Sequence, residues 1–325
     1  MKIAILDDYQ DQVRHLSCFD AVSGHDVTVF NDTISDLNKL ATRLKPFEAI
    51  VLIRERTEIS SDLLAQLPNL KLISQTGKVS NHISLDDCTA HNVAVAEGVG
   101  SPIAPSELAW ALIMAASRHL PSYIQNLQQG SWQQSGSLGL GSTLHGRTLG
   151  IWGFGKIGQR LSAFAEVFGM KVMVWGSENS RSKAVQAGHQ AATSKQEFFS
   201  HCDIISLNLR LNEATRYIVT KQDLDRMKDG SLLVNISRAE LIEPHALYQT
   251  LVENPAKFAA VDVFEQEPAD KQNQPLLNLN NVVATPHLGY VEKNSYELYF
   301  KWALENVAKF AEGQPENIAN PQALR

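Results

Sequence analysis

The sequence lacks the features that mark secreted, metal-binding and membrane-spanning proteins. Its 325 residues include only three cysteines, Cys18, Cys88 and Cys202, an odd number without the spacing of a metal site, which is typical of a reducing compartment. No apolar run is long enough to span a bilayer. The N-terminal residues MKIAILDD are typical of a strand and not of a signal peptide. We therefore expect a cytoplasmic protein without a bound metal.

The chain also has no excess of positive charge. Lys and Arg total 29 against 35 Asp and Glu, so the formal net charge is -6. This balance argues against nucleic acid or an anionic membrane as a partner. The rest of the composition, 44% hydrophobic and 20% charged, is ordinary for a globular protein, and the length suggests about two domains.

The most informative stretch is 147–176, in which a strand, a glycine turn, a helix and a second strand follow one another. The turn consists of Gly153, Phe154, Gly155, Lys156, Ile157 and Gly158. The first glycine permits a tight turn, the second lets the backbone approach a pyrophosphate, and the third lets the helix lie close to the strand. The pattern predicts a dinucleotide-binding unit, although the glycines alone also suit a turn in another α/β protein.

Short apolar strands alternate with segments of helical length, which predicts two α/β domains with parallel sheets. The strands expected in the first domain are 2–6, 27–30, 49–53, 70–74 and 93–95. Those expected after the glycine unit are 204–207, 232–236, 259–263 and 282–285. A mostly apolar helix is expected over 106–119, an ordered loop over 128–142 and a closing helix over 294–311.

Three polar motifs follow the ends of expected strands in the second half of the chain. They include Arg238, Glu267 and His287, respectively. Ligands of open α/β sheets bind at the carboxyl ends of strands. A guanidinium can hold a carboxylate and polarise a carbonyl, and an imidazole beside a carboxylate can exchange a hydroxyl proton. Each residue also has a structural alternative: a surface salt bridge, a solvated loop and a turn, respectively.

In this order, the glycine unit, the N-x-S-R strand end, DVFEQEP and TPHLG resemble the D-isomer-specific 2-hydroxyacid dehydrogenase family. The resemblance implies a Rossmann-type cofactor domain, residues 101–289, inserted in a flavodoxin-like substrate domain of residues 1–100 and 290–325. It also implies hydride transfer between NAD(P)(H) and a 2-oxo acid or D-2-hydroxy acid bound between the domains. Family members usually dimerise through the cofactor domain, so we expect a homodimer that uses the apolar helix around Trp110.

By motif position, the family's catalytic Arg, Glu and acid/base His fall on Arg238, Glu267 and His287. Asp262 then lies near the nicotinamide. The substrate-binding residues implied by the resemblance are Arg54 and the backbone N–H groups of the loop Thr76, Gly77, Lys78 and Val79. The expected cofactor-binding residues are the six of the glycine turn together with Gly176, Ser177, Arg181, Arg210, Ile236 and Asp262. Ala239 stands where the family commonly has glycine, a small change.

The second strand of the glycine unit ends differently from the family pattern. An Asp eighteen residues after Gly158 normally binds the adenosine ribose and repels a 2′-phosphate, but here that position is Gly176. In the expected loop 176–181, Ser177, Ser180 and Arg181 can bind a phosphate, and Arg210 is another candidate. We therefore favour NADP(H) or dual use, while Glu178 remains able to take the ribose role.

Glyoxylate or hydroxypyruvate is the expected substrate. Oxidation of 3-phosphoglycerate is less favoured, because no residues after 325 supply the regulatory domain of long phosphoglycerate dehydrogenases. A non-enzymatic, dinucleotide-sensing corepressor is disfavoured because all three catalytic residue types are kept. Two alternatives stay open: Arg54 and Arg56 either favour an acidic or phosphorylated substrate or pair with Glu55 and Glu58, and Lys78 lies either near the substrate or in solvent.

Overall fold

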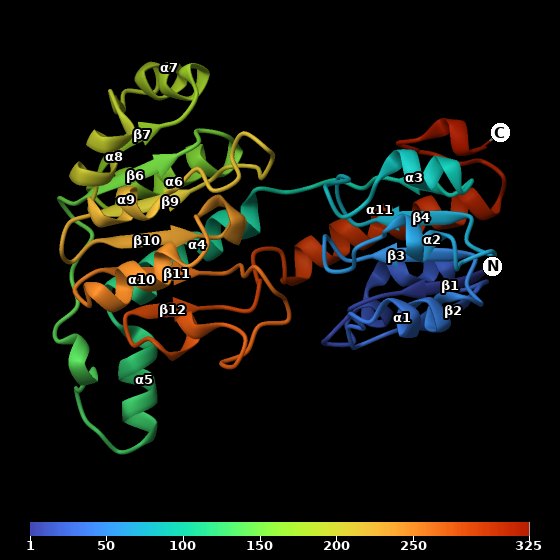
Figure 1. Cartoon of the computed structure of the whole chain (residues 1–325), viewed down its shortest axis with the longest axis horizontal. Coiled ribbons are helices and arrows are strands. Elements are labelled where there is room, and N and C mark those ends of the chain that lie inside the picture. The colour runs from blue at the N-terminus through green and yellow to red at the C-terminus, as the bar shows by residue number, and fades with distance from the viewer. Residues whose placement is uncertain (325) are drawn as a thin grey trace. The chain divides into compact units, whose positions relative to one another are not determined.

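The computed structural model describes residues 1–324 and divides into two units. Unit 1 comprises Met1–Ser101 and Glu292–Arg325, and unit 2 comprises Pro102–Val291. Each unit contains one parallel sheet with helices packed against it (Figure 1). The predicted α/β fold class is therefore confirmed.

The sheet of unit 1 has the strand order β2-β1-β3-β4-β5 with every neighbouring pair parallel. The strands are β1 Lys2–Ile5, β2 Asp26–Val29, β3 Ala49–Leu52, β4 Leu72–Gln75 and β5 Ala94–Ala96. This order is that of flavodoxin-like folds, in which ligands bind at the carboxyl ends of the strands. All strands but β2 are almost wholly buried, as parallel strands covered on both faces must be, and of these described strands only β4 carries buried polar side chains, those of Ser74 and Gln75.

Helices cover both faces of this sheet. Apolar residues of α1 Leu37–Leu44, α2 Ser61–Leu64 and α3 Leu85–Ala90 join one buried cluster with Ile50 and Ile73. The long helix α11 Lys293–Ala311 lies on the other face, because Ser74, next to Ile73, donates to the carbonyl oxygen of Ala303 at 2.7 Å. Three short 3-10 segments complete unit 1: η1 Val13–His15, η2 Ser17–Val22 and η6 Pro321–Leu324.

The sheet of unit 2 has the order β12-β11-β10-β9-β6-β7-β8, again with parallel neighbours. Its strands are β6 Thr148–Trp152, β7 Lys171–Trp175, β8 Gln190–Ala191, β9 Ile204–Leu207, β10 Leu232–Asn235, β11 Phe258–Val261 and β12 Val282–Ala284. The order reverses between β6 and β9, which is the switch point of a Rossmann-type sheet. The glycine turn directly follows β6 at this point.

Two hydrophobic clusters sandwich the sheet of unit 2. On one face, α4 Ile103–Ser117 and α6 Lys156–Val167 pack against residues such as Ile151 and Val234. On the other face, α8 Lys195–His201, α9 Lys221–Asp225 and α10 Ala246–Glu253 pack against Trp152 and Leu233. The remaining elements are α5 Leu120–Gln128, α7 Glu178–Gln186, η3 Gly136–Leu138, η4 Ala239–Leu241 and η5 Pro275–Asn278.

The structure differs from the sequence expectations at two helices. Residues 120–128 form α5, for which no helix was predicted, and the apolar side chains of Leu120, Ile124 and Leu127 on it are exposed. The prediction of a loop over 176–181 is wrong for residues 178–181, because α7 begins at Glu178 with Ser177 as its N-cap. No helix within residues 1–324 combines the length and the apolar character needed to cross a bilayer.

We predict that Gly150→Ala destabilises unit 2. A Cβ atom on Gly150, in β6, would lie 2.5 Å from Sγ of Cys202 and 2.9 Å from the Phe198 ring. Overpacking of this kind costs about 1–3 kcal/mol, which denaturant unfolding should measure. Gly24→Ala is the control, because its Cβ would meet nothing within 4 Å. The double variant Gly150→Ala/Cys202→Ala should recover part of the loss, and equal stability of all variants would contradict the packing argument.

Candidate active site

The glycine turn has the geometry that its sequence predicts. Gly153 has φ +96°, and a Cβ atom there would lie 2.6 Å from the carbonyl oxygen of Asn208. A Cβ atom on Gly158 would lie 2.4 Å from the carbonyl oxygen of Gly153. Only glycine fits at both positions, because the turn is tight and α6 lies directly against it.

The middle glycine leaves room for a ligand. A Cβ atom on Gly155 would meet nothing within 4 Å, and no side chain caps α6, which begins at the exposed Lys156. The first N–H groups of a helix lack partners within it and carry partial positive charge. The residues of this turn therefore fit the pyrophosphate of a dinucleotide.

The end of β7 lies beside this turn. A Cβ atom on Gly176 would be 3.6 Å from the backbone nitrogen of Gly153. The N–H of Phe154 donates to Oγ of Ser180 at 3.5 Å, and the N–H of Ser180 donates to Oγ of Ser177 at 3.3 Å. The guanidinium of Arg181 stacks on the Trp175 ring, 5.2 Å from its centroid. Hydroxyl groups, a helix N-terminus and a cation thus occur together here, without a strand-end carboxylate.

The turn that carries Arg238 is fixed by Asn235, the buried last residue of β10. Its Nδ2 donates to the carbonyl oxygen of Arg238 at 2.8 Å, and its Oδ1 accepts from the N–H of Ser237 at 3.0 Å. Oγ of Ser237 donates to the carbonyl oxygen of Leu207 in β9 at 2.8 Å. Ile236 is buried within the turn, which ties the two strand ends together.

Asp262, directly after β11, anchors the loop that carries His287. Its Oδ1 accepts from Oγ1 of Thr285 at 2.6 Å and from the N–H of Leu288 at 2.7 Å, and its Oδ2 accepts from the N–H of Gly289 at 2.8 Å. Burial raises the pKa of this carboxyl, although the hydrogen bonds oppose the shift. His287 itself adopts a left-handed conformation with φ +53°.

His287 and Glu267 form a close pair. Nδ1 of His287 lies 2.7 Å from Oε2 of Glu267, and the N–H of Phe264 donates to Oε1 at 3.0 Å. Burial raises the pKa of Glu267, but the hydrogen bond and charge of His287 outweigh it, so the pKa lies below its usual value. With Nδ1 held by the carboxylate, Nε2 is the ring nitrogen that can exchange a proton with a substrate.

The predicted substrate loop of unit 1 is partly engaged within the protein. The N–H of Thr76 donates to the carbonyl oxygen of Leu52 at 3.1 Å, and the N–H of Val79 donates to Oε1 of Glu97 at 2.8 Å. Within residues 1–324, only Gly77 and Lys78 of this loop keep N–H groups without a hydrogen bond. Two of the four backbone N–H groups of the predicted substrate loop are therefore already bonded within the protein.

Three cationic side chains lie at or near this loop. Nζ of Lys78 pairs with Oε2 of Glu97 at 2.8 Å and is largely exposed, which fits the solvent alternative. The side chain of Arg54 lies directly over Gly77 and 5.8 Å from the centroid of the Tyr299 ring. Arg56 donates to the carbonyl oxygen of Asp7 at 2.6 Å and stacks on the Tyr9 ring. Arg54 and Arg56 are therefore both positioned at the carboxyl edge of the sheet of unit 1.

Comparison with known proteins identifies the family. Residues 110–289 match the family model described as the NAD binding domain of D-isomer specific 2-hydroxyacid dehydrogenases. The chain belongs to this family. The predicted family and the prediction of an NAD(P)-dependent dehydrogenase are thus confirmed.

Relatives with known names cover most of this dehydrogenase chain. A crystal structure of a phosphoglycerate oxidoreductase from Vibrio cholerae is 65% identical, with a TM-score of 0.95 over 96% of this chain and 99% of that chain. Hydroxypyruvate reductase of Thermotoga maritima is 34% identical over 76% of this chain and 79% of that protein. D-3-phosphoglycerate dehydrogenase of Methanocaldococcus jannaschii is 30% identical over 87% of this chain, which spans 53% of that protein.

Three residues that position groups of the candidate site were not singled out from the sequence. Asn235 and Thr285 are the first residues of two recognised motifs, so their place at strand ends was a usable signal. Glu97 engages Lys78 and Val79 from beyond β5, and no sequence pattern connects it with them. Among residues 1–324, no three His, Cys, Asp or Glu side chains come together as a metal site would require.

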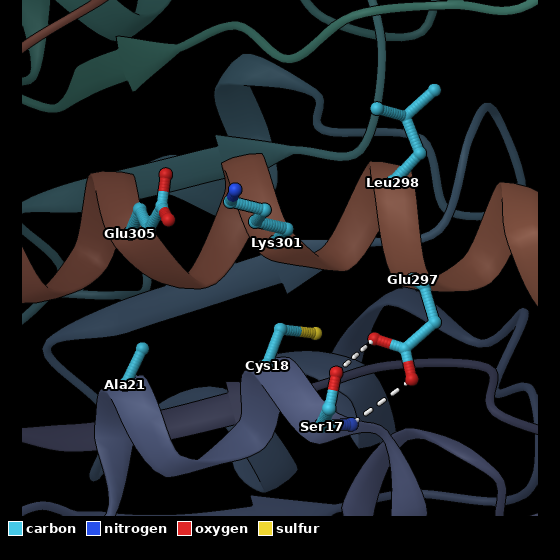
Figure 2. Close-up of a pocket in the computed structure, with 7 residues that line it drawn as sticks. All are labelled: Ser17, Cys18, Ala21, Glu297, Leu298, Lys301 and Glu305. Carbon is cyan, nitrogen blue, oxygen red and sulfur yellow. Dashed lines mark hydrogen bonds between the residues drawn. The ribbon is translucent and has the colours of Figure 1, made fainter.

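Unit 1 of the dehydrogenase also has a hollow of about 710 Å³ between η2 and α11 (Figure 2). The N–H and hydroxyl of Ser17 donate to the two carboxylate oxygens of Glu297 at 3.0 and 2.8 Å. Burial and the negative charge of Glu297 raise the pKa of the neighbouring Cys18 thiol to about 12. Because the thiolate is the nucleophile, this cysteine is unreactive at neutral pH.

We predict that iodoacetamide labels Cys18 in the folded protein at pH 8 about a thousandfold more slowly than in unfolded protein, because so little thiolate is present. Glu297→Gln should speed the labelling severalfold by removing the repulsive charge. Mass spectrometry of tryptic peptides over time gives both rates. Rapid labelling of Cys18 in the folded wild type would contradict the raised pKa.

Proposed function

We propose that this protein is a cytoplasmic reductase that converts a 2-oxo acid, glyoxylate or hydroxypyruvate, into the 2-hydroxy acid. The proposal rests on three residues that lie together at the carboxyl edge of the sheet of unit 2. Arg238, Glu267 and His287 follow β10, β11 and β12, which are adjacent parallel strands, and the His287–Glu267 pair is closed at 2.7 Å. A proton donor and an anion-binding group thus come from neighbouring strand ends.

In the proposed reaction the bound nicotinamide supplies the hydride that adds to C2 of the substrate. Nε2 of His287 donates a proton to the substrate oxygen as the alkoxide develops. Glu267 keeps the ring oriented through Nδ1 and stabilises its protonated form. Arg238 binds the substrate carboxylate and polarises the carbonyl group. His287 is left neutral and must regain a proton from solvent before the next turnover.

We assign residues 1–100 and 290–325 to substrate binding and residues 101–289 to dinucleotide binding. The N–H groups of Gly77 and Lys78 and the guanidinium of Arg54 are the proposed ligands of the substrate carboxylate. A phosphorylated 2-hydroxy acid is the second candidate, because Arg54 and Arg56 both lie at the carboxyl edge of β3 and are held in place. The name of the Vibrio cholerae relative points in the same direction.

NADP(H) is the proposed cofactor. At the end of β7, Gly176 brings no carboxylate to repel a 2′-phosphate. Ser177 and Ser180 offer hydroxyl groups, Arg181 is positioned on the Trp175 ring, and Arg210 is exposed after β9. The opposing feature is the exposed Glu178 in the first turn of α7. The nicotinamide end is assigned to Ile236 and Asp262, and the pyrophosphate to the glycine turn from Gly153 to Gly158.

A homodimer through unit 2 is also proposed. None of the residues of α5 is buried, and the exposed fractions of Leu120, Ile124 and Leu127 are 44%, 55% and 57%. Trp132, just beyond the helix, is 74% exposed. Apolar patches of this kind mark protein interfaces, and a second copy of the chain is the expected partner.

The first test compares initial rates with NADPH and NADH, using glyoxylate and hydroxypyruvate. We expect kcat/KM to be at least about tenfold higher with NADPH, and Arg181→Gln to remove about 10- to 100-fold of the NADPH value while leaving the NADH value unchanged, as for loss of a charged hydrogen bond. Arg226→Gln, at the C-cap of α9, is the matched control.

A preference for NADH would contradict the cofactor proposal and favour Glu178 as the ribose ligand. Binding of dinucleotide without turnover of any 2-oxo or 2-hydroxy acid would contradict the enzymatic proposal and support a dinucleotide sensor. Equal loss in Arg181→Gln with both cofactors would show that Arg181 supports the fold and does not select the phosphate.

A second test addresses Glu267. Its lowered pKa keeps Glu267 ionised, so it holds Nδ1 of His287 as a charged acceptor, which the amide of Glu267→Gln cannot do. We expect kcat to fall about 100-fold. Glu213→Gln, exposed and distant in sequence, is the control. An unchanged kcat in Glu267→Gln would exclude this role.

A further inference from the structure

A second pocket in unit 2, of about 280 Å³, lies behind the turns that carry Arg238 and Glu267. Its walls come from the residues after β10, from the start of α10 and from the segment that follows β11; these elements are neighbours in Figure 1. Arg238, Glu267 and His287 do not line it. The pocket is therefore separate from the proposed catalytic groups, although it adjoins the backbone that carries them.

We propose that this pocket binds a small organic cation with an aromatic or branched apolar body, and that its occupant alters the turns of Arg238 and Glu267. The floor is apolar and includes Ile242, Leu247 and Val261, all of which are buried. Apolar floors with a few polar groups at the rim are typical of small-molecule sites, and a volume near 300 Å³ is at the small end of their range, about 300–1,000 Å³.

The charge of the lining selects a cation. Among the described residues that form the pocket are two carboxylates, Glu243 and Glu265, one histidine, His245, and no lysine or arginine. The N–H of Lys221 donates to Oε2 of Glu243 at 3.0 Å, which holds that side chain in place. The rings of Tyr248 and Phe264 offer faces that attract an ammonium group. The two carboxylates make the pocket less favourable for an anionic metabolite than for a cation.

Two wall residues connect the pocket with the site. Nδ2 of Asn235 donates to the carbonyl oxygen of Arg238 at 2.8 Å, and the N–H of Phe264 donates to Oε1 of Glu267 at 3.0 Å. A ligand that moves either wall residue therefore moves a hydrogen-bond partner of a proposed catalytic residue. A ligand shifts such an equilibrium only through different affinities for the two arrangements. This coupling rests on the proposed function, whereas binding to the pocket does not.

The binding test uses 2-phenylethylammonium as the probe, with 3-phenylpropionate and 2-phenylethanol as anionic and neutral analogues. Calorimetric or NMR titration is done without substrate or dinucleotide, so that failure of the proposed reaction cannot affect it. We expect saturable binding of the cation, no binding of the anion, and affinity for the alcohol at least about threefold weaker. Glu243→Gln and Glu265→Gln should each weaken cation binding about threefold.

Glu213→Gln, an exposed carboxylate outside the pocket, is the control and should bind the cation as the wild type does. Tyr248→Leu, which keeps an apolar side chain, should weaken binding of the cation more than binding of the alcohol. Absence of saturable binding, equal binding of the anion, or unchanged affinity in Glu243→Gln/Glu265→Gln would overturn the proposed site.

The coupling test measures 2-oxo acid reduction with saturating 2-phenylethylammonium. We expect kcat to change at least twofold in the wild type, and the change to disappear in Glu243→Gln/Glu265→Gln. An effect of equal size in the double variant would place the probe elsewhere and overturn the proposal. Binding without a change in kcat would overturn the coupling to the turns.

Discussion

The candidate site depends on one buried carboxylate. Asp262 receives three hydrogen bonds from the segment 285–289 and so joins the end of β11 to the residues that follow β12. A buried carboxyl group is strongly unfavourable unless hydrogen-bond donors surround it, and here two backbone N–H groups and a hydroxyl provide them. The same three bonds fix the left-handed conformation of His287 and thereby its distance to Glu267.

The parallel sheet explains why dinucleotide-binding and proton-transferring groups occur in one unit. All seven strands of unit 2 run in the same direction, so their carboxyl ends form a single edge. The glycine turn follows β6, the fifth of the seven strands across the sheet, and the turns of Arg238, Asp262 and His287 follow the three strands at one side. Because a backbone turn ends each strand, the residues at this edge can vary while the buried strands remain unchanged.

Much of this arrangement was predictable from the sequence. Strands buried on both faces appear as continuous apolar runs, and the glycines reveal positions where a side chain would collide with backbone. The helix α5 was not predicted because none of its residues is buried. Without a buried face, it has no inward-facing apolar pattern from which a helix is predicted. The start of α7 was missed because Ser177 and Glu178 suit either a loop or an N-cap, and only tertiary context decides. The role of Glu97 in the Thr76–Val79 loop depends on a contact across β4 and β5, which no local spacing encodes.

The discontinuity of unit 1 has a consequence for biosynthesis. Its sheet is made from the first hundred residues, but one face is covered by α11, and the N–H of Val95 in β5 donates to Oδ1 of Asn320 at 2.8 Å. During translation these strands leave the ribosome long before α11, with all of unit 2 made in between. A nascent chain therefore presents an uncovered apolar sheet face for most of its synthesis, the state in which aggregation competes with folding and chaperones bind. Completion of unit 1 is a late, long-range event, while unit 2, which is continuous in sequence, can fold as soon as it emerges.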